Sequence, residues 1–174
     1  MSSLAQSPPA PAGVPSPWGA RQILDDLLKD NEKLTPLLSQ MRTQEWESQK
    51  GASSVYTTQW HMAQQQLSDV ITSSRLLGQK TESLPLALDV YFRLEALEVT
   101  TRSLLEGVTK YGERSTADQL NGLIARNFSA RERFRDYIRD LAASREQDFK
   151  AADAEAQRCR AIISREPAVK GTRK

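Results

Sequence analysis

Apolar residues recur at helical spacing along most of the chain, and residues 53–79 give the clearest signal. Alternating steps of four and three residues separate Tyr56, Trp60, Ala63, Leu67, Val70, Ser74 and Leu77. A 3.5-residue repeat is typical of helices that pack in bundles or coiled coils. With Ser53 or Ser54 as the N-cap, this pattern predicts an amphipathic helix whose stripe faces a core.

An earlier helix is predicted from about residue 18. Its apolar stripe comprises Ile23, Leu24, Leu27, Leu28 and Leu34, and continues with Leu37, Leu38 and Met41. Thr35 and Pro36 have the order of an N-cap and a first-turn proline, so we expect the helix to kink or restart there. Gly51 is the expected terminator.

Two further helices follow. The third restarts at Ser83–Pro85 and has a wide apolar face that predicts the most buried helix, with Leu84, Leu88, Tyr91, Leu94, Leu97, Leu104, Leu105 and Val108. The fourth starts after Gly112, with Ser115 or Thr116 as the cap, and meets no breaker before about residue 164. Its expected core stripe is Leu120, Ile124, Phe128, Phe134, Ile138 and Leu141.

These helices predict an all-α fold, an antiparallel up-and-down four-helix bundle with a long C-terminal helix. The fourth helix would be roughly 70 Å long against about 40 Å for the second and third, so it must overhang. The overhang carries a thin stripe of candidate interface residues, Phe149, Ala152, Ala156, Cys159 and Ile163. It could pack on the amino-terminal half of the first helix, pack on a second subunit, or fray. We favour the first of these, with self-association next.

Composition limits the chain to one domain. It has 174 residues, 26% charged and 39% apolar, with few glycines and aromatic residues. We divide it into a Pro/Ala/Ser-rich disordered tail at 1–17, a helical bundle at 18–165 and a basic disordered tail at 166–174. No apolar run is long enough to span a bilayer.

Few residues suggest a catalytic, metal or ligand-binding site. A single histidine, His61, and a single cysteine, Cys159, give no metal-ligand cluster, and no phosphate loop or nucleophile motif occurs. We therefore name no catalytic residue and no cofactor. The candidate binding residues are Trp46, beside a loop, and Tyr91 and Glu95 on the most apolar helix, where a partly buried carboxylate could transfer protons.

Arginines at 131, 135 and 139 stand one turn apart and could follow a phosphate backbone. Acids at 132, 136 and 140 interrupt them, however, and the chain's formal charge is only +2. Alternating signs are typical of a solvated helix face, so nucleic acid is disfavoured as a partner.

The amino-terminal sequence bears on the cellular location of the protein. Ser3 and Ala5 are spaced like the residues before a signal-peptidase cut, but a signal peptide's basic and apolar regions are missing. Either Met1 is not the native start or the segment is a disordered cytoplasmic tail. We favour export, hence a periplasmic or secreted protein.

Three runs carry a resemblance: QEW at 44–46, FRLEALE at 92–98 and SREQDFKAADAEAQRCR at 144–160. They resemble uncharacterised bacterial helical proteins, some of them exported, over most of residues 20–165. The resemblance implies a bacterial, exported protein, but no activity and no site residues.

The function expected from these observations is non-enzymatic. Such a bundle would act through helix surfaces on an unidentified protein partner or on a second copy of itself. One alternative is a small-ligand or enzymatic site inside the bundle near Glu95. The other is nucleic-acid binding along the face of Arg131, Arg135 and Arg139.

Overall fold

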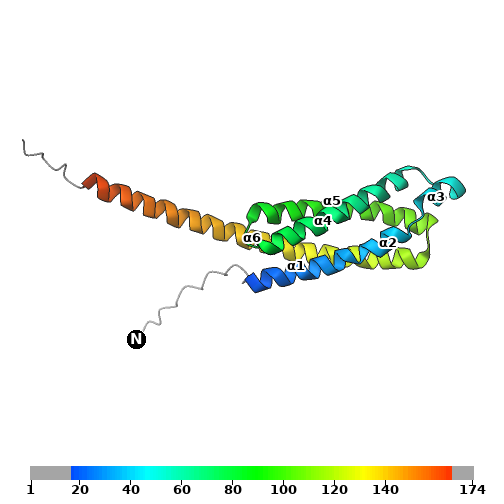
Figure 1. Ribbon diagram of the computed structural model, residues 1–174, viewed down its shortest axis with the longest axis horizontal. Helices are drawn as coiled ribbons and strands as arrows, with labels where there is room; N and C mark the ends of the chain where they lie inside the picture. The colour runs from blue at the N-terminus through cyan, green and yellow to red at the C-terminus, as the bar shows by residue number, and fades with distance from the viewer. Residues whose placement is uncertain (1–16, 166–174) are drawn as a thin grey trace, which may run out of the picture.

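The computed structural model describes residues 17–165, which form six helices. These are α1 (Pro17–Glu32), α2 (Leu34–Gln40), α3 (Thr43–Lys50), α4 (Val55–Gln79), α5 (Leu84–Tyr111) and α6 (Arg114–Arg165). Figure 1 shows α1 and α2 as one bent column beside α4, α5 and the first part of α6. The tails predicted at the two ends lie outside the described residues, except that Pro17 begins α1.

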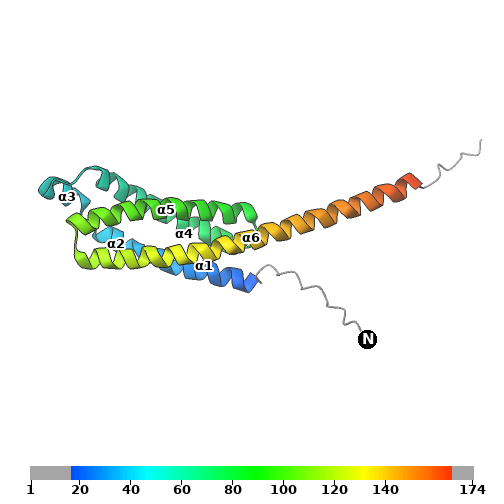
Figure 2. The same cartoon turned by 180° about the vertical axis from the view of Figure 1, so that it is seen from behind.

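The bundle is all-helical and antiparallel, as predicted. The chain runs up through α1 and α2, down α4, up α5 and down α6, and the view from behind in Figure 2 shows the same order. α5 packs between α4 and α6, while α1 packs against both α6 and α4. Antiparallel pairing of α4 with α5 is marked by the hydrogen bond from Ser103 to Gln59 at 3.0 Å and the ion pair of Arg93 with Asp69 at 3.5 Å.

The break in the first column falls at Lys33, slightly before the predicted position. Lys33 caps α2 without a side-chain hydrogen bond, and Pro36 lies in the first turn of α2 rather than at its first position. A first-turn proline loses no intrahelical hydrogen bond, so Pro36 is compatible with a helix that begins two residues earlier. α3 is a separate short helix that ends at Gly51 in the left-handed region, with φ of 66°, as the terminator prediction requires.

The core follows the predicted stripes. On α4, Ala63, Leu67, Val70, Ser74 and Leu77 are all buried, and Trp60 donates its indole N–H to the Leu38 carbonyl at the end of α2. On α6, Leu120, Ile124, Phe134, Ile138 and Leu141 are buried. Phe128 is an exception, because its side chain lies at the surface beside Arg131, and Leu88 of the predicted α5 face is also exposed. The predictions that these two residues face the core are wrong.

One glycine is required by helix packing. A Cβ built on Gly107 of α5 would lie 2.7 Å from Cδ1 of the Tyr56 ring on α4. Gly122 of α6 offers a contrast, since a Cβ there meets only an arginine tip at 3.8 Å. Substitution by alanine should therefore have opposite effects on stability at Gly107 and at Gly122.

We expect Gly107→Ala to destabilise the protein by about 1–3 kcal/mol, because the aromatic ring must shift and overpack its neighbours. Gly122→Ala should instead stabilise it by about 0.5–1 kcal/mol through helix propensity. Urea unfolding of both variants tests this contrast. A stabilised Gly107→Ala variant would show that α4 and α5 are not closely packed at Tyr56.

α6 leaves the bundle beside the loop that joins α4 to α5. Tyr137 donates a hydrogen bond to the Thr81 carbonyl, and Arg145 donates to the Glu82 carbonyl at 2.9 Å, so the loop between α4 and α5 is tied to α6. Burial raises the pKa of the Tyr137 phenol. Beyond Arg145 every residue of α6 whose side chain is described is exposed. With 52 residues, α6 is about 78 Å long.

The preferred prediction for this overhang is wrong. α1 pairs with α6 through Asp30 and Arg126 and through Asp26 and Arg133, an antiparallel alignment that brings the start of α1 beside the end of the buried part of α6. It therefore does not reach Phe149 or the residues after it. In both views the last part of α6 extends alone away from the bundle (Figures 1 and 2).

Candidate interaction surfaces

Residues 146–165, here called the projecting helix, carry several exposed apolar side chains. Phe149 is 73% exposed, Ile162 65% and Ile163 71%, and Cys159 is also exposed. The sequence-predicted interface residues Phe149, Ala152, Ala156, Cys159 and Ile163 follow one another at steps of three and four along it. This geometry brings all five onto one stripe, which is the spacing of a coiled-coil seam.

Charge is separated along the projecting helix. Residues 146–155 contain four acids and one lysine, a net charge of −3, whereas residues 156–165 contain three arginines and no acid, a net charge of +3. Several charges are paired within the helix, including Lys150 with Glu146 at 2.6 Å and Arg158 with Glu155 at 3.4 Å. The hydrogen bond from Lys150 lowers the pKa of the Glu146 carboxyl.

Among residues 146–164, whose side chains are described, two charged side chains have no ion pair. These are Asp153 and Arg160, which lie seven residues apart and directly follow the stripe residues Ala152 and Cys159. Both therefore flank the stripe on the same edge, the position from which coiled-coil helices form ion pairs with a partner helix.

Trp46 lies at the opposite end of the bundle. It is only 5% exposed and packs with Tyr56 and Tyr111, with ring centroids 5.9–6.5 Å apart among the three. Lys50, at the end of α3, donates a hydrogen bond to the Tyr111 carbonyl. Trp46, a candidate binding residue from the sequence, therefore lies in the core at this end of the bundle, with little surface exposed to a partner.

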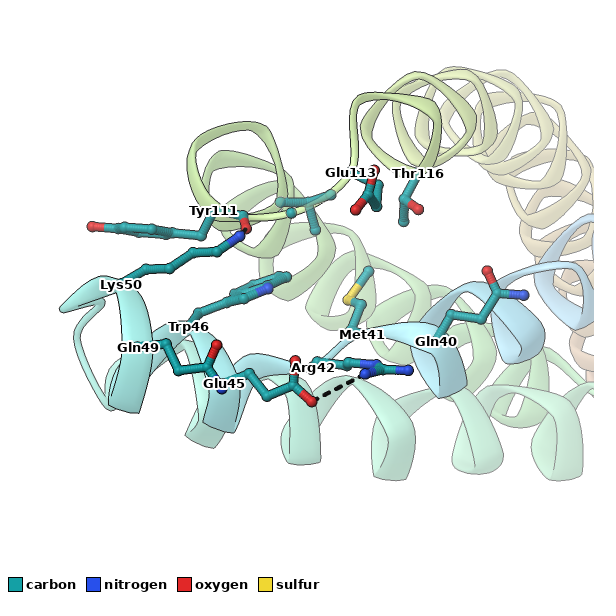
Figure 3. Close-up of a pocket in the computed structure, with 12 residues that line it drawn as sticks. Gln40, Met41, Arg42, Glu45, Trp46, Gln49, Lys50, Tyr111, Glu113 and Thr116 are labelled. Carbon is teal, nitrogen blue, oxygen red and sulfur yellow. Dashed lines mark hydrogen bonds and ion pairs between the residues drawn. The ribbon is translucent and has the colours of Figure 1, made fainter.

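A pocket of about 430 Å³ opens beside this aromatic cluster. Figure 3 shows Trp46 and Tyr111 on one side and Met41 and Gln40 on the other. Its charged residues balance, since Arg42 and Lys50 face Glu45 and Glu113, and Arg42 is already paired with Glu45 at 3.1 Å. The pocket therefore selects no particular ligand chemistry.

Tyr91 and Glu95 meet at Arg131, which reaches in from α6. Arg131 lies 3.4 Å from carboxylate oxygens of both Glu95 and Glu98, and its guanidinium covers the Tyr91 and Phe128 rings. Burial, with the nearby Glu95 charge, raises the pKa of the Tyr91 phenol. The Glu95 side chain remains 42% exposed, so it is an ion-pair partner at the rim rather than a carboxylate held in an apolar pocket.

Below Arg131 lies a small polar layer that the apolar patterns did not indicate. Asn31 is 1% exposed and donates to the Leu27 carbonyl at 2.8 Å, and Asn127 donates to Asn31 at 3.4 Å. The cavity between them and Arg131 measures about 10 Å³, room for one water at most, so it cannot hold a substrate. The sequence does contain one sign of this layer: Asn31 lies on the apolar stripe of the first helix, four residues after Leu27 and three before Leu34.

The two glutamates beside Arg131 should differ in their effect on stability. Glu98 has a side chain only 13% exposed, against 42% for Glu95. We expect Glu98→Gln to cost about 1.5–3 kcal/mol because it removes the charge of a mostly buried carboxylate that is paired with the mostly buried Arg131. Glu95→Gln should cost less than about 1 kcal/mol, as for other exposed ion pairs. Chemical denaturation of the two variants tests the difference, and a larger loss for Glu95→Gln would contradict this assignment.

The three arginines proposed as a phosphate-binding row do not form one surface. Arg131 turns toward α5 and is mostly buried, whereas Arg135 and Arg139 lie outside and pair with Glu132 at 2.7 Å and Asp136 at 3.6 Å. The side chains that would contact phosphates are thus buried or already paired with acids on the same helix. This arrangement does not favour nucleic-acid binding.

Residues 17–165 include no candidate metal site and no membrane-spanning helix. No group of three or more His, Cys, Asp or Glu side chains in this range could hold a metal ion. No helix in the described range is both long and apolar enough to cross a membrane.

The chain matches no protein-family model, no curated protein and no solved structure. The resemblance to bacterial exported helical proteins therefore stays a prediction.

Proposed function

We propose that the protein is a non-enzymatic helical-bundle protein that acts by self-association through its projecting helix. The observation that carries the proposal is a heptad-spaced stripe left entirely exposed on a helix that extends beyond its own bundle. An exposed helix of about twenty residues gains little from propensity alone, and packing of an apolar face is what ordinarily stabilises such a segment.

A second copy is the favoured partner because each half of the projecting helix is complementary in charge to the other half. Arg158 and Arg160 lie in a half with a net charge of +3, and Asp153 and Glu155 lie in a half with a net charge of −3. Opposite charges that meet across an interface favour the correct partner and alignment. The alternatives have less support, because the cavity nearest Glu95 holds one water at most and the arginine row is divided.

Sedimentation equilibrium of the full chain under reducing conditions tests the proposal. We expect the mean mass to rise from 19.5 kDa toward twice that value as concentration increases. A reducing buffer excludes a disulfide through Cys159 as the cause. A constant mass of 19.5 kDa up to the highest soluble concentration would overturn the proposal.

A further inference from the structure

We infer that two copies pair their projecting helices antiparallel, with Asp153 of each copy beside Arg160 of the other. This inference rests on the proposed self-association and adds the orientation and register of the interface. Three features of residues 146–165 support it independently: the separation of charge, the two unpaired side chains, and the order of large and small residues along the stripe.

The separation of charge selects the orientation. An antiparallel pair places the half with a net charge of −3 against the half with a net charge of +3, and does so twice. A parallel pair in register places each half against an identical half. Like-charge contacts across an interface disfavour an arrangement even where each contact is partly screened.

The unpaired side chains select the register. Asp153 and Arg160 follow consecutive stripe positions on the same edge and have no ion pair in the described part of the chain. In antiparallel helices this edge meets the same edge of the partner. Placing Asp153 beside the partner's Arg160 satisfies both residues in both copies and puts the twofold axis near residue 157.

The stripe fits this register by size. With the axis near residue 157, Ile163 lies beside the partner's Ala152, and Ala156 lies beside the partner's Cys159. The large Ile163 thus meets a small residue, and the central Ala156 and Cys159 are both small enough to allow close approach of the two helices. A parallel arrangement in register would instead place each residue on its own copy, so that Ala152, Ala156 and Cys159 would form three consecutive layers of small residues.

A charge exchange tests the orientation. We expect Asp153→Arg to raise the dissociation constant of the dimer about tenfold, since two attractive pairs become two repulsive ones, and Arg160→Asp to do the same. The double variant Asp153→Arg with Arg160→Asp should return within about threefold of the original value, because it restores both pairs. Sedimentation equilibrium provides the dissociation constants, and circular dichroism checks that each variant keeps its helices.

A second double variant distinguishes the parallel arrangement. In a parallel heptad pairing, Arg160 lies beside Glu155 of the other copy. The double variant Glu155→Arg with Arg160→Asp would then restore association. The double variant Asp153→Arg with Arg160→Asp would not. That result would overturn the antiparallel arrangement and leave the proposed self-association standing. Unchanged association in all four variants would overturn the inference by placing the interface elsewhere. A chain that stays monomeric before any substitution would overturn both proposals.

Discussion

Replacing Ala152 and Ala156 together by glutamate is expected to raise the dissociation constant of the dimer at least about a hundredfold. Both alanines lie in the centre of the exposed stripe. In the proposed dimer their carboxylates would lose water without gaining a charged hydrogen-bond partner, and burying an unpaired charge is among the most costly changes at an interface. The monomer should keep its fold, because both positions face solvent and glutamate is a good helix former.

The matched control is Ala151→Glu with Ala154→Glu. These alanines are exposed on the opposite side of the same helix segment, so the control adds the same charge without entering the stripe. We expect it to leave the dissociation constant within about threefold of the original value, with the remainder due to longer-range charge effects. Equal weakening by both pairs would indicate general repulsion rather than a packed stripe. A lower melting temperature with unchanged mass in the Ala152/Ala156 variant would show that the stripe packs within one chain.

The largest loss of monomer stability is expected from Phe134→Ala. Phe134 has 0% exposure at the centre of the buried part of α6, and its ring stacks on Tyr137 with centroids 6.0 Å apart. Truncating a fully buried phenylalanine removes apolar burial and leaves a cavity, so we expect a loss of about 3–5 kcal/mol in the free energy of unfolding. Guanidinium denaturation at a concentration where the chain is monomeric measures it.

Phe149→Ala is the control on the same helix. Phe149 is 73% exposed on the projecting helix, so its truncation should change the unfolding free energy of the monomer by less than about 0.5 kcal/mol. The two phenylalanines lie fifteen residues apart on one continuous helix. Similar losses at both positions would contradict the division of α6 into a buried part and a projecting helix.

Much of the fold could be predicted because its signals are local. The alternating steps from Ala63 to Leu77 place the buried face of α4, and Gly51 and Pro85 lie where helix punctuation predicts them. The restart near Pro36 was predicted slightly late because proline is tolerated anywhere in a first turn. α3 was not separated from the first helix, because Trp46 is the only large apolar residue in its eight positions.

The polar layer under Arg131 could not be predicted in the same way. An apolar periodicity shows which residues share a face, but not which polar residue on a neighbouring face turns inward. Arg131 of α6 pairs with Glu98 of α5, and its guanidinium lies over the ring of Phe128, the residue that the pattern assigned to the core. Such a pairing depends on the relative register of two helices, which neither helix specifies alone.

The projecting helix shows the same limit. Its length follows from the absence of a breaker between Arg114 and Arg165, and the thin stripe along it was visible in the sequence. The neighbour of that stripe depends on where α1 begins relative to α6. The alignment of Asp30 with Arg126 and of Asp26 with Arg133 shows that α1 begins too late in the chain to cover Phe149.

Small-angle X-ray scattering of the full chain at high concentration tests the central claim most directly. An antiparallel dimer with its axis near residue 157 predicts twice the mass of 19.5 kDa and two separate bundles. Their near ends, at Arg145 of each copy, would be about 36 Å apart along the paired helices. The predicted result is a two-lobed distance distribution whose second maximum, the separation of the bundle centres, exceeds that gap by about 40 Å, the length of one bundle. A monomer's mass, or a dimer whose bundles lie side by side, would contradict it.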